Sequence, residues 1–176
     1  YIEDVIDEKS RIAAVKLAKN ILSGRASTDA PLNKALVAES KVVINDIIEQ
    51  LLENPSLMVN LTDIRSIDDY LLGHSVNVCV LSLITGVSLG YDKTKLMRLG
   101  LGSLMHDIGK TMIPPHILNK PGSLTNDEYS VIKRHSEYGY LILTNENSQI
   151  KKLSALIALQ HHERYNGEGY PGGAQG

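Results

Sequence analysis

The sequence predicts an all-α fold, a helical bundle with an additional helical region at its N-terminal side. Apolar residues recur at helical intervals along most of the 176 residues, and no segment shows a convincing strict alternation of apolar and polar residues. The chain is 43% hydrophobic and 22% charged, as ordinary globular domains are. Its net charge is −2 and it has no basic block, so polymeric nucleic acid is not an expected partner.

The first two helices are predicted in residues 2–22 and in the stretch that opens at Asp29-Ala30-Pro31. Gly24 follows the first helix and suits the position after a helix C-terminus. Asn54-Pro55 ends the second helix, because a residue that precedes proline avoids the α region.

A boundary near residue 65 is predicted between two parts of the chain. Residues 1–65 form an N-terminal helical region, and residues 66–176 form the core that carries the chemistry described below. No motif marks the N-terminal region, and we expect its helices to mediate homodimerisation or signal transfer.

The core begins with a long apolar helix. Ser66-Ile67-Asp68-Asp69 is a suitable N-terminal cap, and from there to about Leu89 apolar residues cover most of the helix circumference, which predicts a buried helix. Gly90 ends this helix. Asp92 caps the next one, which runs to the His106-Asp107 pair.

The C-terminal half contains a clear break and two further predicted helices. Ile113-Pro114-Pro115 interrupts helical structure. Thr125 and Glu128 have the spacing of a capping box, which starts a helix that we expect to reach about Asn145. The last helix is predicted over residues 148–162 and ends in Gly- and Pro-rich sequence.

The histidines are placed at intervals of about one helix and one connection. The intervals are 32 residues from His74 to His106, 29 from there to His135, and 26 from there to His161. Successive helices of a bundle can therefore each direct a ligand to one shared point, as in helical di-metal proteins. Imidazole and carboxylate ligands suit iron, manganese, zinc or nickel.

Taken singly, each of these residues also has a simpler interpretation. His74 could be a hydrogen-bonded core residue, although an imidazole in so apolar a stretch needs a partner. His106-Asp107 could be a charge pair at a helix C-terminus, and His161-His162 a solvated helix end. Lys110 could bind a phosphate oxygen or be an exposed lysine at a helix end. The joint pattern favours metal ligation.

Two residues are not expected to take part in a site. His116 follows two prolines in a predicted loop and is expected at the surface. Cys79 is expected to pack as a small apolar side chain, and as the single cysteine it excludes an internal disulfide, which fits a reducing, cytoplasmic compartment. No apolar run reaches the length of about 18 residues that a membrane span requires.

Four segments of the core resemble the HD-GYP family, a branch of the HD-domain metal-dependent phosphohydrolases. They are His106-Asp107-Ile108-Gly109-Lys110, Ile117-Leu118-Asn119-Lys120-Pro121-Gly122-Ser123-Leu124-Thr125, Lys133-Arg134-His135, and His161-His162-Glu163-Arg164-Tyr165-Asn166-Gly167-Glu168-Gly169-Tyr170-Pro171. The last segment contains the Gly-Tyr-Pro triplet for which the family is named. Together the segments lie within residues 68–173.

The resemblance implies an HD-type helical bundle that hydrolyses cyclic di-GMP to linear pGpG or GMP through a metal-activated hydroxide. It implies two divalent ions, iron or manganese in the first place and zinc, nickel or magnesium as alternatives. Family members with a third ion carry a Glu where this chain has Tyr70. Lys110 falls on the phosphate-contacting position. The implied ligands are His74, His106, Asp107 as the bridge, His135, His161 and His162.

The resemblance also bears on the C-terminal end. The loop of Gly169, Tyr170 and Pro171 is expected to close over substrate or to bind cyclic di-GMP synthase domains of the GGDEF type. The family pattern continues into a further helix with an Asp ligand, whereas the sequence ends at Gly176. We therefore expect incomplete metal occupancy and low activity wherever that helix is absent.

Two other functions remain open at this point. One is a different HD-type nucleotide phosphohydrolase, acting on guanosine tetraphosphate or a mixed cyclic dinucleotide, of which the Gly-Tyr-Pro triplet disfavours the first. The other is a non-catalytic module that binds cyclic dinucleotides or protein partners. Retention of all the implied ligands disfavours a pure scaffold.

Overall fold

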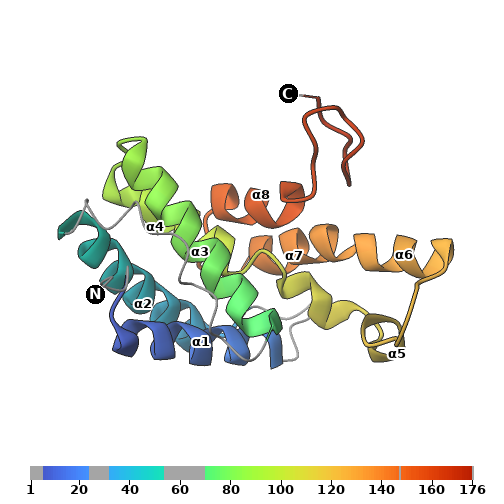
Figure 1. Ribbon diagram of the computed structural model, residues 1–176, viewed down its shortest axis with the longest axis horizontal. Helices are drawn as coiled ribbons and strands as arrows, with labels where there is room; N and C mark the ends of the chain where they lie inside the picture. Colours follow the sequence, from blue (N-terminus) through green and yellow to red (C-terminus); the bar gives the residue numbers. More distant parts are fainter. Residues whose placement is uncertain (1–5, 24–31, 54–69, 147, 176) are drawn as a thin grey trace.

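A computed structural model describes residues 6–23, 32–53, 70–146 and 148–175, and within these ranges the chain is helical without a β-strand (Figure 1). The predicted all-α class is confirmed. The elements are α1 (Glu8–Ser23), α2 (Lys34–Glu53), α3 (Tyr70–Ser88), α4 (Lys93–Leu104), the 3₁₀ helix η3 (Ile108–Met112), α5 (Pro115–Leu118), α6 (Asn126–Lys133), α7 (His135–Thr144) and α8 (Lys152–Gln160).

Short polar side chains set the starts of the first two helices. The Asp7 carboxylate accepts the Ser10 amide at 2.7 Å, so α1 begins at Glu8, later than the predicted start at residue 2. The Asn33 side chain accepts the Ala35 amide at 2.9 Å at the start of α2. The predicted signals lie outside the described residues: Gly24, Asp29-Ala30-Pro31, Asn54-Pro55 and Ser66-Ile67-Asp68-Asp69.

Two predicted caps are confirmed. The Asp92 carboxylate accepts the Lys95 amide at 2.8 Å at the start of α4. At the start of α6 the Thr125 hydroxyl accepts the Glu128 amide at 3.2 Å, and the Glu128 carboxylate accepts the Thr125 amide at 2.7 Å, which is the reciprocal capping box.

The helix predicted from Thr125 to Asn145 is two helices, α6 and α7, which meet at Arg134. The His135 ring makes a hydrogen bond at this break. Its Nδ1 donates to the Ile132 carbonyl at 2.8 Å, and in a continuous helix that carbonyl would accept the Ser136 amide.

Other boundaries also differ from the prediction. α8 begins at Lys152 instead of residue 148. The break at Ile113-Pro114-Pro115 is short, because Pro115 occupies the first turn of α5, where its missing N–H costs nothing. His116 therefore lies in a helix and not in a loop, and it is exposed as predicted.

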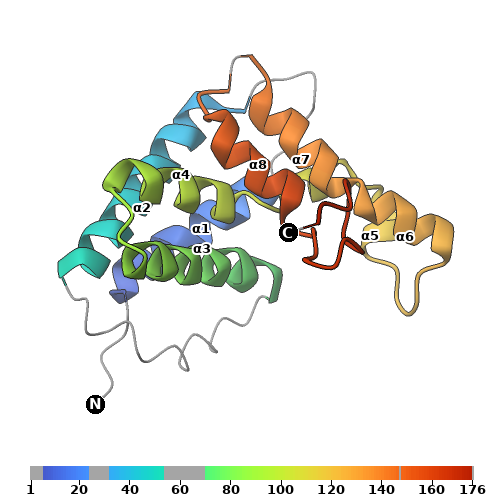
Figure 2. The same cartoon turned by 90° about the horizontal axis from the view of Figure 1, so that it is seen from above.

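The helices share one hydrophobic core. α3 packs along α4, which also contacts α2 and α8, while α1 contacts α3 and η3 packs on α7. Figure 2 shows α7 and α8 side by side on the face of α4 away from α3. Leu17 and Ile44 from the N-terminal helices join Leu83 and Leu96 in this core, and all four are fully buried. The domain boundary near residue 65 stays a prediction.

The prediction for α3 is only partly right. The helix buries one broad face, but His74 is exposed and Leu81 is 38% exposed on the other. Cys79 packs as predicted, with its thiol donating to the Gly100 carbonyl at 3.5 Å, and burial raises the pKa of this thiol to about 12. None of the helices in the described ranges combines the length and apolar character needed to cross a bilayer.

At Gly109, η3 packs very closely on α7. A Cβ atom at this position would lie 2.5 Å from the Gly139 amide nitrogen and 2.8 Å from the His135 carbonyl carbon. Both atoms belong to the backbone, so they cannot move aside alone. Only glycine allows η3 to approach the first turn of α7 this closely.

We predict that Gly109→Ala lowers the free energy of unfolding by about 1–3 kcal/mol, because the added methyl group forces η3 away from α7. Urea denaturation followed by circular dichroism measures this. Gly139→Ala is the comparison at the same contact: its Cβ would crowd a side-chain atom, the Ala158 Cβ at 3.3 Å, with no backbone atom nearer than 3.5 Å, so it should cost less than Gly109→Ala. Equal stability of the Gly109→Ala variant and the wild type would contradict the close approach.

Candidate metal centre

The His106-Asp107 pair occupies the turn between α4 and η3. The residues on either side, Met105 and Ile108, are 1% and 0% exposed and anchor the turn in the core. Because apolar side chains hold both ends of the turn, the polar pair is directed into the protein, where His106 and Asp107 are each 4% exposed. A buried apolar residue therefore stands on each side of the polar pair, and this places the Asp107 carboxylate inside the bundle.

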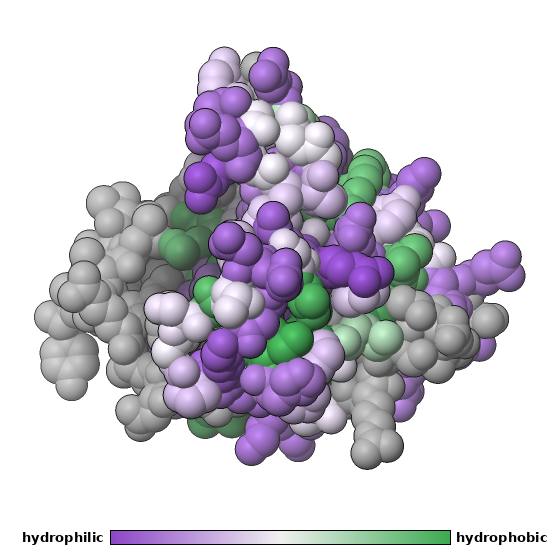
Figure 3. All heavy atoms as spheres, turned by 90° about the vertical axis from the view of Figure 1, so that its right-hand side faces the viewer, coloured by the Kyte–Doolittle hydropathy of each residue, from purple (hydrophilic) through white to green (hydrophobic). Residues whose placement is uncertain are grey.

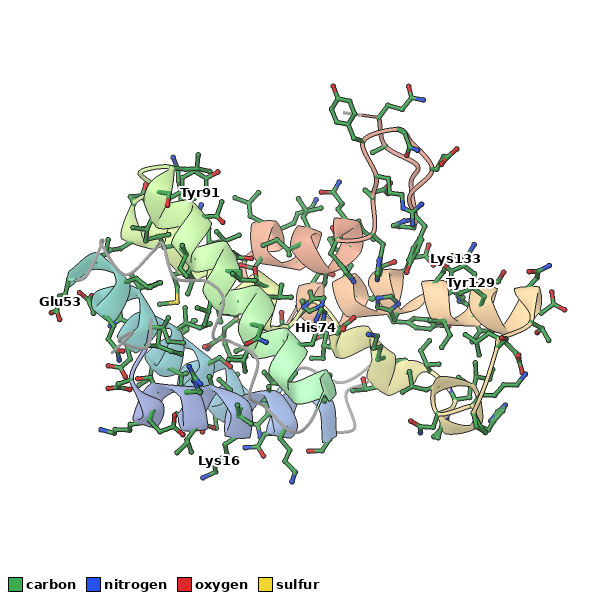
Figure 4. The ribbon with its side chains drawn as sticks, viewed as in Figure 1. Lys16, Glu53, His74, Tyr91, Tyr129 and Lys133 are labelled. Carbon is green, nitrogen blue, oxygen red and sulfur yellow. The ribbon has the colours of Figure 1, made fainter. Side chains whose placement is uncertain are left out.

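Histidines from three other elements meet this pair. His74 projects from α3, His135 begins α7, and His161 and His162 follow the last residue of α8. Figure 4 shows His74 beside the region where η3 and α7 meet. The ring centroids are 5.3 Å apart for His74 and His106, 4.8 Å for His106 and His161, 5.1 Å for His135 and His161, and 5.0 Å for His135 and His162. The structure thus brings all the implied ligands together.

Three of the histidines are held in one tautomer. Each ring places Nδ1 against the carbonyl oxygen three residues earlier, and since a carbonyl can only accept, Nδ1 must carry the proton. Nε2 is then left with a lone pair that faces the other rings. The bonds join His106 to Ser103 at 2.7 Å, His135 to Ile132 at 2.8 Å, and His161 to Ala158 at 2.9 Å.

Two of these Nε2 atoms converge on one oxygen of Asp107, Oδ1. Nε2 of His135 and Nε2 of His161 are 3.1 Å apart, and they lie 3.4 Å and 3.7 Å from Asp107 Oδ1. Among the described residues, this buried oxygen has no hydrogen-bond partner. Lone pairs that face one another and a carboxylate oxygen are repulsive without a cation, so these residues fit a divalent metal ion.

Asp107 belongs to two groups of donors. Its carboxylate lies with His135, His161 and His162 in one group and with His74 and His106 in the other, and within each group the donor atoms are at most 4.8 Å apart. A carboxylate has two oxygens and can contact two ions. The geometry is therefore suited to a pair of ions joined by Asp107, and the donor set to iron, manganese, zinc or nickel.

Desolvation favours the neutral form of three of the imidazoles. It lowers the pKa of His74 and of His135, and with the neighbouring His161 and His135 rings it lowers the pKa of His162 to about 4. Burial alone would raise the pKa of Asp107, but the Lys110 ammonium, which donates to Oδ2 at 2.6 Å, keeps it well below its usual range. Neutral imidazoles and an ionised carboxylate are the forms that bind metal ions.

The prediction that His74 is buried is wrong. The ring is exposed at the rim of the site, because the helical pattern of α3 shows an apolar surface but not where the neighbouring helices stop covering it. His116 on α5 lies in neither donor group, as predicted.

Lys110 stands beside the centre. Its ammonium donates to Asp107 Oδ2 at 2.6 Å, and His106 Nε2 lies 3.3 Å from the same oxygen. A quarter of the Lys110 side chain is exposed. Lys110, Gly169 and Tyr170 line a pocket of about 510 Å³ together with His135 and His162.

Glu163 was not identified from the sequence as a site residue. Its carboxylate accepts the Gly172 amide at 2.6 Å and the Ala174 amide at 2.9 Å, which folds the C-terminal loop back on itself. The Tyr170 amide donates to the His162 carbonyl at 3.2 Å, and its ring stacks on the His162 ring with centroids 4.6 Å apart. The sequence did contain one signal for this role: Glu163 is a carboxylate that directly follows the His-His pair and precedes a glycine-rich run.

Comparison with known proteins places this centre in a family. Residues 46–176 match the family model described as HD domain. The chain is 35% identical over 146 residues to the Pseudomonas aeruginosa protein named cyclic di-GMP phosphodiesterase PA4108, covering 82% of this chain and 35% of that protein. It is 33% identical over 162 residues to the Xanthomonas campestris cyclic di-GMP phosphodiesterase response regulator RpfG, covering 89% and 42%.

A third relative carries a different name. The Vibrio cholerae protein named 3′3′-cGAMP-specific phosphodiesterase 1 is 36% identical over 129 residues, which cover 73% of this chain and 29% of that protein. The chain thus spans between a quarter and a half of the length of these relatives. The match to the HD-domain model, together with these relatives, shows that the chain belongs to the HD-domain phosphohydrolases, as its HD-GYP motifs predicted.

Proposed function

We propose that this chain is the hydrolytic domain of a cyclic di-GMP phosphodiesterase that yields linear pGpG or GMP. The observation that carries the proposal is the convergence of imidazole lone pairs on the buried, unpaired oxygen of Asp107. The names of two relatives supply the substrate class. The chain's own centre supplies a place for hydrolytic chemistry.

In this proposal two divalent ions, iron or manganese, are held by one bridging carboxylate and five imidazoles. When bound, such ions stabilise charge on a phosphoryl oxygen and activate water at neutral pH. The chain's contribution is to fix the ligands: the carbonyls of Ser103, Ile132 and Ala158 orient three rings. The proposed ligands are His74, His106, Asp107, His135, His161 and His162.

Lys110 is proposed to bind the phosphate. Its ammonium already lies at the carboxylate, and its partly exposed stem borders the pocket beside His135 and His162. From there a small rotation of the side chain can direct the charge to a phosphoryl oxygen. The pocket is also bordered by Gly169 and Tyr170, which supports the loop of Gly169, Tyr170 and Pro171 as a wall or lid for substrate. A synthase partner and a homodimer through α1 and α2 stay predictions.

A mixed cyclic dinucleotide is the second candidate substrate, because one relative is named as specific for 3′3′-cGAMP. We predict that the protein, loaded with manganese or iron, hydrolyses cyclic di-GMP at least about tenfold faster than 3′3′-cGAMP or guanosine tetraphosphate, as judged by kcat/KM. Chromatography of the products measures the rates. Faster hydrolysis of one of the other two compounds would make that compound the proposed substrate. If the metal-loaded protein hydrolyses none of the three, a non-catalytic module is favoured.

We predict that Asp107→Asn lowers both metal content and turnover, because the amide removes the charge that the two donor groups share. The loss of metal affinity should exceed about tenfold. Elemental analysis of the purified protein measures the content. His116→Ala is the control, since it removes an exposed histidine that belongs to neither group. Unchanged metal content in Asp107→Asn would rule out this centre.

The metal-free protein should lose stability as the pH falls from 7 to 4. The histidines titrate near 6.5 in the unfolded chain, whereas the folded protein lowers the pKa of His74 and His135 and brings that of His162 to about 4. Below pH 6.5 the unfolded chain therefore takes up protons that the folded protein does not, which favours unfolding.

Urea midpoints measured in the presence of a chelator at pH 7, 6, 5 and 4 test this expectation. The midpoint should fall at each step, and saturating manganese should raise it most at pH 7, where protons compete least for the imidazoles. A midpoint that stays constant over this range would show that the imidazoles take up protons in the folded protein as readily as in the unfolded chain.

A further inference from the structure

The pocket beside the metal centre is larger than a single phosphate group requires. It measures about 510 Å³, and His135 and His162 mark the end that touches the centre. The remaining wall comes from α6 and the C-terminal loop, with Tyr129, Lys133 and Arg164 among its residues. None of these three has a role in the centre itself.

On α6, Tyr129 and Lys133 form a paired surface. They lie one helical turn apart, and the Lys133 ammonium is 5.3 Å from the centroid of the Tyr129 ring. Tyr129 is 48% exposed. Figure 4 shows both side chains on the side of α6 that faces the C-terminal loop. No carboxylate of the described chain pairs with Lys133, so its charge is available to a ligand.

The opposite wall is also aromatic. Tyr170 stacks on His162 with an angle of 23° between the rings, and the loop that carries it is held by Glu163. Seen from the α5–α6 end in Figure 3, the surface is mostly hydrophilic with small apolar areas between the polar ones. The pocket therefore combines ring faces with positive charge from Lys110, Lys133 and Arg164, against the single carboxylate of Glu168.

A nucleotide is the ligand that matches this combination. Its base stacks on an aromatic ring, which is worth about 1–3 kcal/mol per base, and its phosphate pairs with an ammonium. A volume of about 510 Å³ accommodates a ligand well beyond a single phosphate group.

We propose that Tyr129 and Lys133 form a subsite for the nucleotide that is not being cleaved: its base stacks on Tyr129 and its phosphate pairs with Lys133. This rests on the proposed function, since it presumes a cyclic dinucleotide whose other phosphate lies at the metal centre. The subsite selects dinucleotides over simple phosphodiesters, while the hydrolytic step stays with the Asp107 centre.

A comparison of two substrates distinguishes an effect on the subsite from an effect on the metal centre. Cyclic di-GMP carries a second nucleotide, and bis(p-nitrophenyl) phosphate is a phosphodiester without one. Tyr129→Leu and Lys133→Gln should each raise KM for cyclic di-GMP about tenfold. The same variants should leave kcat/KM for bis(p-nitrophenyl) phosphate within about twofold of the wild type.

The chain offers a matched control pair. Lys95 lies over the Tyr91 ring at 5.7 Å, in the same kind of contact, and neither residue borders the pocket. Tyr91→Leu and Lys95→Gln should therefore leave both substrates unaffected. Figure 4 shows Tyr91 at the far end of the molecule from Tyr129.

The outcomes distinguish this inference from the proposed function. If the wild type hydrolyses cyclic di-GMP and the Tyr129 and Lys133 variants keep its KM, the subsite is refuted and the function stands. If both substrates are slowed equally, the two residues act on the centre and not on the second nucleotide, which also refutes the subsite. If the wild type cleaves bis(p-nitrophenyl) phosphate but no cyclic dinucleotide, the proposed function itself fails.

Discussion

The buried carboxylate of Asp107 is the constraint on which the described structure depends. A charged group with so little exposure is costly unless opposite charges or hydrogen bonds surround it. Here the Lys110 ammonium contacts one oxygen, while the other faces the Nε2 lone pairs of His135 and His161, an arrangement that a bound cation would complete. Those contacts require η3, α7 and α8 to meet at one point, and Gly109 permits the approach. The packing of the helices and the composition of the centre are therefore two consequences of one requirement.

The sequence predicted that the histidines converge, because this depends on which helix carries each histidine, and helical periodicity shows that. Helical periodicity and the spacing of His74, His106, His135 and His161 give one histidine per helix and connection. The exposure of His74 depends on where neighbouring helices end, which no local pattern contains. The break at Arg134 is likewise not in the local pattern, which predicts one helix; at the break, the His135 ring bonds the Ile132 carbonyl while the rest of the ring reaches the centre.

Glu163 shows the same limit from another side. In the sequence it is one acidic residue after two histidines, and nothing local indicates that its carboxylate accepts amides nine and eleven residues later. That contact turns the glycine-rich run into a folded loop, and the loop sets Tyr170 against His162. A residue outside both donor groups thus fixes the position of a ring within one of them. Such positioning roles require the fold to be known.

The two parts of the site differ in how they are built, and in the proposed function this difference would separate hydrolysis from substrate choice. The donor groups stand mainly on buried elements: His106, Asp107 and His135 are each at most 4% exposed. The pocket wall is formed by α6 and the C-terminal loop, where Tyr129 is 48% exposed and the ring faces open to solvent. Substitutions on that wall disturb little packing, so it can change while the centre is kept. Under the proposed function, this wall is where a preference between cyclic di-GMP and 3′3′-cGAMP, the substrates for which two relatives are named, would be set.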